Sequence, residues 1–134
     1  MTLRAALVAV LGSLLCSASL ACGACAEDKV AATYDHALVR QAAARGDVMV
    51  FCEVRGPVDA SRLKAAALGV HGVRPHSVRV SAQPAALSFA LDPTLQSAQA
   101  AVERMRRAAG PGTRLAIVQV LPSAARAFRP ASTP

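Results

Sequence analysis

The chain has 134 residues, of which 54% are hydrophobic, only 3% are aromatic and none is tryptophan. Once an export segment is removed, this length leaves room for one domain of about 100 residues, with a core of alanine, valine and leucine. The net charge of +7 comes mainly from arginine, and charge alone would admit nucleic acid or an anionic membrane surface as a partner. The basic residues are scattered along the chain, however, which favours a solvated surface, and we expect no nucleic-acid partner.

Residues 1–21 have the pattern of a secretory signal peptide. A positive start at Arg4 is followed by an apolar run from Ala5 to Leu15 and then by small residues up to Ala21. The apolar run is shorter than the stretch of about 20 residues that a membrane-spanning helix needs. We therefore expect an exported protein, periplasmic or secreted.

The position of signal cleavage decides which cysteines the mature protein keeps. Cleavage after Ala21 leaves Cys22, Cys25 and Cys52, whereas cleavage after Ala26 removes the first two of these. A third alternative is a membrane-anchored lipoprotein, in which Cys22 accepts the lipid and its sulfur becomes a thioether. The sequence leaves these three alternatives open.

Residues 22–47 are expected to hold the cysteine pair and one accessory helix. The helix is predicted from Glu27 to Arg45, with Asp28 as its N-terminal cap and Gly46 as its left-handed stop. Its apolar stripe consists of residues spaced by four, namely Val30, Tyr34, Leu38 and Ala42. A narrow stripe of this kind indicates packing against the face of a sheet.

Residues 48–121 alternate between strand and helix patterns. In chain order we predict a strand over 48–54, a helix over 60–69, strands over 77–81 and 85–91, a helix from Asp92, and a strand over 114–121. This order is that of the ferredoxin-like βαββαβ fold, an α+β fold with a four-stranded antiparallel sheet. The last helix is expected to bury one stripe, formed by Leu95, Ala98, Val102 and Met105. A flexible tail over residues 122–134 should follow.

Both faces of the predicted sheet carry apolar residues, although two helices can cover only one face. Alternation along the first strand places one set beneath the two helices: Val48, Val50, Cys52 and Val54. Cys52 is then most simply a small buried apolar residue. The opposite face would expose Met49 and Phe51, so we expect the accessory helix, a protein partner or the tail to cover part of it.

Several short segments of this region follow a familiar pattern. They are Gly56 after the first strand, residues 68–73 (Leu-Gly-Val-His-Gly-Val), residues 77–80 (Ser-Val-Arg-Val), and residues 86–89 (Ala-Leu-Ser-Phe) shortly before Asp92. In these segments the chain resembles heavy-metal-associated domains, the ferredoxin-like modules of copper chaperones and metal-pumping ATPases. That family binds its metal through two cysteines between the first strand and the first helix. Here residues 55–59 read Arg-Gly-Pro-Val-Asp, so the resemblance implies the scaffold without the family's metal site.

Cys22 and Cys25 form the only dense group of soft ligands in the sequence. Two thiolates separated by two residues can bind Cu(I) with two sulfurs, or supply two of the four ligands that Zn requires. His36 is not expected to join them, because it would lie about 12 Å or more along the predicted helix. The sequence does not decide whether His71 and His76 approach the pair, and ordinary surface roles are expected for them. The cysteine pair also admits a redox interpretation, in which it cycles between dithiol and disulfide.

Our first hypothesis is a small exported protein that binds or carries a soft metal, copper-like, through Cys22 and Cys25. The alternatives are a periplasmic or lipid-anchored interaction module that binds a protein partner on its open sheet face without metal, and a thiol-disulfide protein. An enzyme is not expected, because Asp35 and His36 are the only adjacent acid and base, and neighbours on a helix point in different directions.

Overall fold

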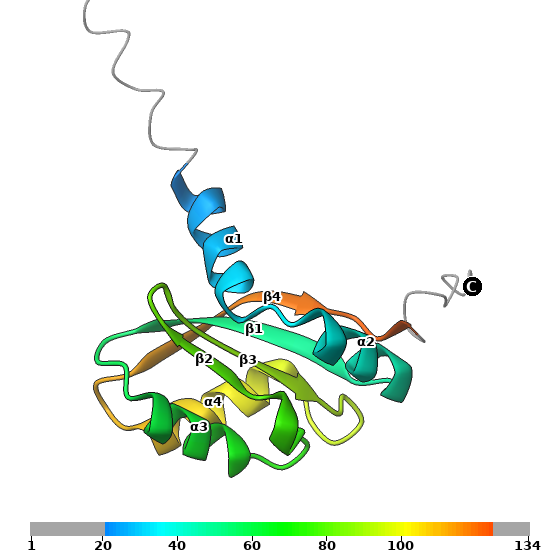
Figure 1. Cartoon of the computed structure of the whole chain (residues 1–134). Coiled ribbons are helices and arrows are strands. Elements are labelled where there is room, and N and C mark those ends of the chain that lie inside the picture. Colours follow the sequence, from blue (N-terminus) through cyan, green and yellow to red (C-terminus); the bar gives the residue numbers. More distant parts are fainter. Residues whose placement is uncertain (1–20, 125–134) are drawn as a thin grey trace, which may run out of the picture.

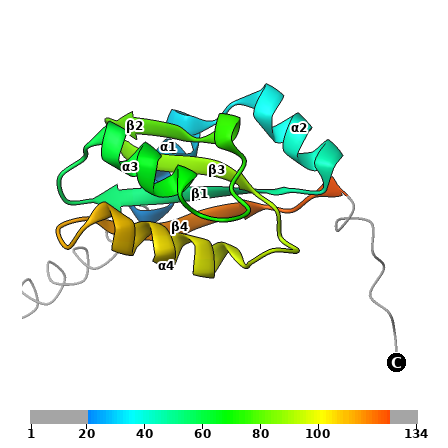
Figure 2. The ribbon, with the colours of Figure 1, turned by 90° about the horizontal axis from the view of Figure 1, so that it is seen from below.

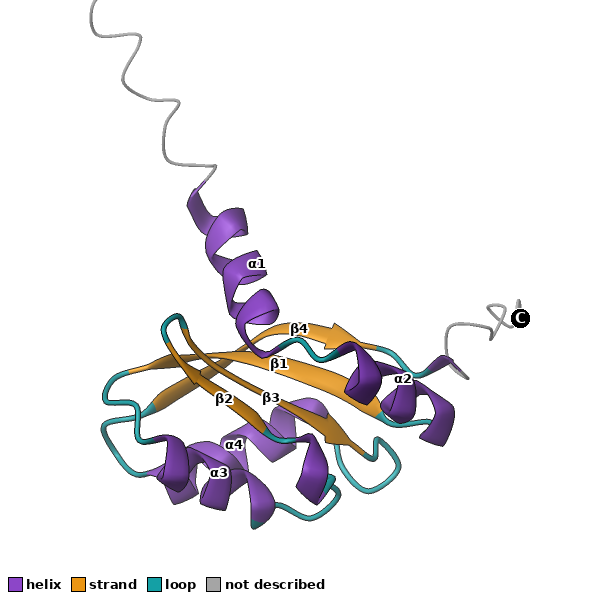
Figure 3. Ribbon diagram, in the orientation of Figure 1, coloured by secondary structure: helices purple, strands orange, loops and turns teal. Residues whose placement is uncertain are grey.

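The computed structural model describes residues 21–124, which form an α+β protein with four α-helices and a four-stranded antiparallel sheet (Figures 1 and 3). The predicted signal peptide lies outside these residues except for Ala21, and only residues 122–124 of the predicted tail are described, with Ser123 buried. The elements in chain order are α1 (Ala21–Thr33), α2 (His36–Arg45), β1 (Val48–Arg55), α3 (Ala60–Leu68), a 3₁₀ turn (Pro75–Ser77), β2 (Arg79–Ala82), β3 (Ala85–Leu91), α4 (Ala98–Ala109) and β4 (Arg114–Leu121).

The strands lie in the order β2-β3-β1-β4, and every neighbouring pair is antiparallel. β1 and β3 therefore occupy the centre of the sheet, while β2 and β4 form its edges. Helices α3 and α4 pack side by side on one face, and α1 and α2 lie on the other (Figures 1 and 2). This arrangement is compatible with the predicted ferredoxin-like fold.

The main core lies between the sheet and the pair α3 and α4. All four β1 residues assigned to this face are buried in it, which confirms the alternation predicted for Val48, Val50, Cys52 and Val54. The helices contribute fully buried side chains such as Leu63 from α3 and Met105 from α4. Asp59 caps α3 as expected, since its carboxylate accepts a hydrogen bond from the Arg62 backbone N–H at 3.0 Å.

A second, smaller core lies on the opposite face of the sheet. Met49, Phe51 and Ala90 are buried there against Ala42 of α2, with Val30 of α1 packed at the margin. The expectation that this face needs a cover is thus confirmed, and of the three candidate covers it is the accessory helical segment that provides it. As a result, β1 is shielded from water on both faces over residues 48–52.

The prediction of one accessory helix was wrong, because the helix is interrupted at Tyr34 and Asp35. Asp35 has an extended backbone, and its carboxylate accepts hydrogen bonds from the N–H groups of Ala37 (3.0 Å) and Leu38 (3.2 Å). Short acidic side chains favour such caps over helix interiors, so the segment starts a new helix here. Asp28, the predicted cap, instead lies inside α1. The predicted stop at Gly46 is confirmed, with φ +80°.

The last helix begins later than predicted, at Ala98 rather than near Asp92. The Asp92 carboxylate accepts hydrogen bonds from the backbone N–H (3.0 Å) and the hydroxyl (2.6 Å) of Thr94, which holds a turn instead of a first helical turn. Ser97 caps the helix through the Ala100 N–H at 3.1 Å. Leu95 is consequently half exposed, and only the later part of the predicted stripe is buried.

A β-bulge lets β4 serve both cores. The register of β4 against β1 shifts between Phe51 and Cys52, so one residue of β4 is left over in the ladder. Leu115 and Ile117 pack against the main core, whereas Val118 and Leu121 pack against the second core. The apolar run of β4, with no strict alternation, is explained by this change of face.

A partly buried ion pair connects three segments of the chain at one end of the sheet. The Asp47 side chain is 1% exposed and accepts hydrogen bonds from Arg74 Nε at 2.8 Å and Nη2 at 2.9 Å. The same guanidinium reaches Asp92 at 3.4 Å. Arg74 thereby links the turn before β1, the loop before β2 and the end of β3.

Candidate functional site

Cys22 and Cys25 lie within the first five residues of α1, three residues apart along the helix. Helical residues with this spacing share one face of the helix. Figure 1 shows that the N-terminal end of α1 projects away from the sheet, while its C-terminal end lies over the strands. The backbone therefore brings the two predicted metal ligands to one side of a projecting helix end.

Contacts near the C-terminal end of α1 attach it to the sheet. Lys29 Nζ donates a hydrogen bond to the Ala85 carbonyl at 3.2 Å, and the Ser88 hydroxyl donates to the Thr33 carbonyl at 3.1 Å. One residue beyond the helix, the ring of Tyr34 stacks on that of Phe51 with centroids 6.3 Å apart. The cysteine end of α1 thus lies on the far side of these anchoring contacts.

The three histidines are distributed over other elements. His36 begins α2, beyond the C-terminal end of α1, and the helix from Cys25 to that end measures about 12 Å. His71 follows α3 and His76 lies in the 3₁₀ turn, so both belong to the connection between α3 and β2. Among the side chains that the structure describes, no three of the types His, Cys, Asp and Glu gather as a metal site. The cysteine pair therefore remains the candidate site.

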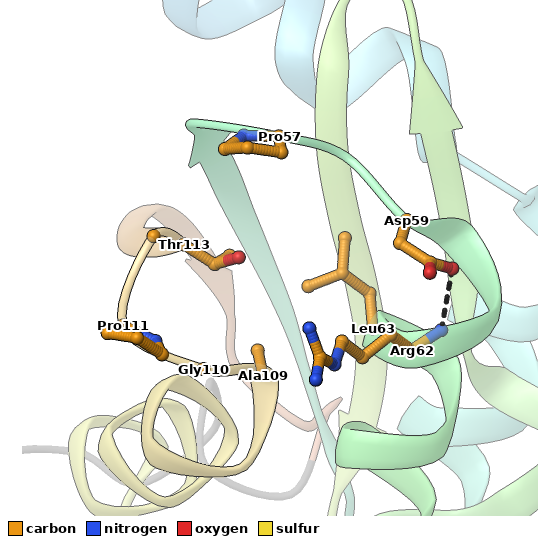
Figure 4. A pocket seen from close by; sticks show the side chains of 9 residues that line it. Pro57, Asp59, Arg62, Leu63, Ala109, Gly110, Pro111 and Thr113 are labelled. Carbon is orange, nitrogen blue, oxygen red and sulfur yellow. Dashed lines mark hydrogen bonds between the residues drawn. The ribbon is translucent and has the colours of Figure 1, made fainter.

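The loop between β1 and α3 borders a cavity of about 240 Å³ (Figure 4). The cavity is lined by Pro57, Asp59, Arg62, Leu63, Ala109, Gly110, Pro111, Gly112 and Thr113. None of these residues offers sulfur or imidazole, and the one carboxylate among them, that of Asp59, is already engaged in capping α3. The donor set of this loop does not suit a soft metal.

Two loops touch at the rim of this cavity. Gly56 has φ +95°, and a Cβ built on it would overlap the carbonyl oxygen of Gly112. A side chain at position 56 is therefore disfavoured both by its backbone conformation and by the neighbouring loop. The close approach joins the connection between β1 and α3 to the connection between α4 and β4.

Cys52 is separate from the candidate site, and its thiol is unreactive. It is fully buried in the main core, and this burial raises the pKa of its thiol to about 12. A thiol with such a pKa is almost entirely protonated at neutral pH, so it is neither a good nucleophile nor a ready metal ligand. The predicted role of Cys52 as a small buried apolar residue is confirmed.

Asp35, the acid of the adjacent acid and base, has a structural role at the start of α2. The Leu38 N–H, together with Arg79 and the Ala37 N–H, lowers the pKa of the Asp35 carboxyl, which also forms an ion pair with Arg79 at 3.3 Å. The carboxylate is therefore held as a helix cap.

A surface hollow of about 410 Å³ beside α1 was not anticipated from the sequence. Its lining comes from α1, from the break that follows and from β4: Glu27, Val30, Ala31, Tyr34 and Gln119. Tyr34 is 47% exposed there although its ring also stacks on Phe51. Only the helix break, signalled by Asp35 as a cap, could have revealed that Tyr34 leaves the buried stripe.

Comparison with protein-family models, curated proteins and solved structures finds no match to this chain. Within residues 21–124, none of the helices combines the length and apolar character needed to cross a membrane. The class that the structure defines is an α+β protein whose antiparallel sheet lies between two pairs of helices. Its function has to be argued from the residues themselves.

Proposed function

We propose that this protein is exported and binds or carries a soft metal ion through the thiolates of Cys22 and Cys25. One observation carries the proposal: both cysteines share a face of α1 at the end that projects from the sheet (Figure 1). Side chains three apart on a helix have Cβ atoms about 5–6 Å apart, which lets two sulfurs approach one ion. A site on a projecting end is also open to a second protein that delivers or receives the ion.

Cu(I) suits this donor set better than Zn. Thiolates are the ligands that select Cu(I), and two of them suffice for it, whereas Zn requires four ligands. With Zn, the remaining two ligands would have to come from another molecule. The N-terminal end of a helix favours anionic ligands, although the nearby Glu27 and Asp28 oppose a further negative charge.

We further propose that residues 48–121 form a ferredoxin-like domain that acts as the body of the carrier. The element order from β1 to β4 and the strand order β2-β3-β1-β4 support this assignment. Relative to the heavy-metal-associated domains it resembles, the chain would have moved its cysteines from the loop after the first strand to an added helix. The second core and the hydrogen bonds of Lys29 and Thr33 to β3 would then hold α1 in place.

The test starts by measuring the intact mass of the mature protein, purified after cells have exported and processed the full chain. A chain that begins at Glu27, or a lipid-modified Cys22, removes the metal proposal. If both thiols survive, the reduced protein should bind one Cu(I) in competition with a chromogenic chelator, and the double variant Cys22→Ser, Cys25→Ser should lose this binding. The Cys52→Ala variant is the matched control and should bind like the native protein. Equal affinity in the double variant would contradict the proposal.

The hollow beside α1 favours a second candidate function, that of an exported protein-interaction module. The sheet face beneath α1 and α2 is closed, but Tyr34 and the apolar side chains next to it leave a partly apolar surface in reach of a partner. In this case the double serine variant would keep its partner, and Tyr34→Ala would lose it. A thiol-disulfide protein would instead show a reversible bond between Cys22 and Cys25 with a measurable reduction potential.

A further inference from the structure

Two arginines face each other across neighbouring strands. In the antiparallel pairing of β1 and β4, Arg55 is the direct partner of Arg114, at the end of both strands. Like charges in directly opposite positions destabilise a sheet. Along the sequence, 58 positions separate these two arginines, and only the strand register brings them together.

Arg55 and Arg114 both line a surface hollow of about 390 Å³. Its lining combines three guanidinium groups, one carboxylate and a small apolar floor, from Glu53, Arg55, Arg106, Arg114, Leu115 and Ala116. The charge of this lining is therefore +2. The Arg55 side chain is 72% exposed, so an anion can enter the hollow from solvent.

The acidic groups nearby do not neutralise the hollow completely. Arg55 forms an ion pair with Glu53 at 2.6 Å, and Arg106 forms one with Glu103 on the same helix. Arg114 has no ion-pair partner among residues 21–124. One guanidinium, opposite a second one, is thus left to attract an anion.

The backbone holds the two opposed arginines at a fixed separation. Gly56 follows Arg55 directly and approaches the carbonyl oxygen of Gly112, two residues before Arg114. The contact joins the two loops, so the strand ends that carry the arginines cannot separate independently.

We infer that this hollow is a binding site for a phosphate-type oxyanion, either a free phosphate or the phosphate of an anionic lipid headgroup. Guanidinium groups donate paired hydrogen bonds that match the oxygens of such anions. An anion between Arg55 and Arg114 also removes the repulsion that the strand register imposes. The site lies on the body of the protein and does not depend on the fate of the cysteine pair.

The test measures binding of inorganic phosphate by NMR chemical-shift titration, and binding to phosphatidylcholine vesicles with and without phosphatidylglycerol by cosedimentation, at an ionic strength of about 0.05 M. Saturable shifts at Arg55 and Arg114 support the site, and vesicle binding that needs phosphatidylglycerol and is competed by phosphate identifies the headgroup as its source. Phosphate binding without vesicle binding identifies a free anion. The absence of both kinds of binding overturns the inference.

Matched variants separate this site from general charge attraction. Arg114→Ala and Arg55→Ala should each weaken binding about tenfold or more, and Arg114→Lys should weaken it less because the charge remains. Arg40→Ala removes the same charge from an exposed position on α2 and should change the affinity by less than about twofold. An equal loss in Arg40→Ala would show binding to net charge alone and would refute the site. Urea midpoints no lower than that of the native protein establish that the variants are folded.

Discussion

Replacement of Gly56 by alanine should destabilise the protein well beyond the cost of its backbone conformation. Gly56 has φ +95°, and for an L-residue this left-handed region costs about 1–2 kcal/mol. The new methyl group would also overlap the Gly112 carbonyl oxygen, a rigid backbone atom, and such overpacking costs about 1–3 kcal/mol more. The expected loss in free energy of unfolding is therefore about 2–5 kcal/mol.

Gly46→Ala provides the matched control. Gly46 has φ +80°, but a Cβ built on it meets nothing within 4 Å, so only the conformational cost of about 1–2 kcal/mol applies. With a urea m-value of about 1 kcal/mol per M, Gly46→Ala should lower the unfolding midpoint by about 1–2 M and Gly56→Ala by clearly more. Equal midpoints for the two variants would refute the contact between the loops, and with it the fixed spacing of the strand ends that carry Arg55 and Arg114.

Three further predictions concern single side chains. Arg74→Ala leaves the Asp47 carboxylate buried without its partner and should cost about 3 kcal/mol in urea unfolding, whereas the exposed Arg104→Ala should cost less than about 0.5 kcal/mol. The pKa of Asp35 is lowered in the folded state, so its contribution to stability is present above its ordinary pKa of about 4 and is lost as the pH falls through the lowered value. Asp35→Asn keeps a capping oxygen but cannot titrate, so it should reduce the fall of the thermal unfolding midpoint between about pH 5 and pH 2. A fall as large as that of the native protein would contradict this role. Because burial raises the pKa of Cys52 to about 12, alkylation mapped by mass spectrometry at about pH 8 should modify Cys52 only as the protein unfolds, and rapid labelling of the native protein would argue against its burial.

The local patterns of the sequence predicted the body of the fold well. The last two strands were predicted at 85–91 and 114–121, as observed. Asp59 caps the start of α3, and Gly46 terminates α2, as predicted. Alternation along β1 correctly divided its residues between two faces. These features depend on residues that are close in sequence, so they can be predicted from a single sequence.

The helix boundaries were predicted wrongly where an aspartate side chain could form alternative hydrogen bonds. Asp35 could have stayed in a helix with its carboxylate in water, but it caps α2 and breaks the segment. Asp92 could have capped a helix, but it holds Thr94 in a turn. Each choice depends on the tertiary site, since Arg79 reaches Asp35 and Arg74 reaches Asp92 from other elements. For the site, the sequence predicted the cysteine pair, whereas the opposition of Arg55 and Arg114 follows only from strand register.

The central strand β1 supplies side chains to both cores, and five successive residues from Val48 to Cys52 are buried. In a saturation mutagenesis screen, these five positions should tolerate almost no polar replacement. A strand with one solvent-exposed face would instead tolerate polar residues at every second position. Homologous chains, when aligned, should accordingly vary little at all five positions, and not only at every second one.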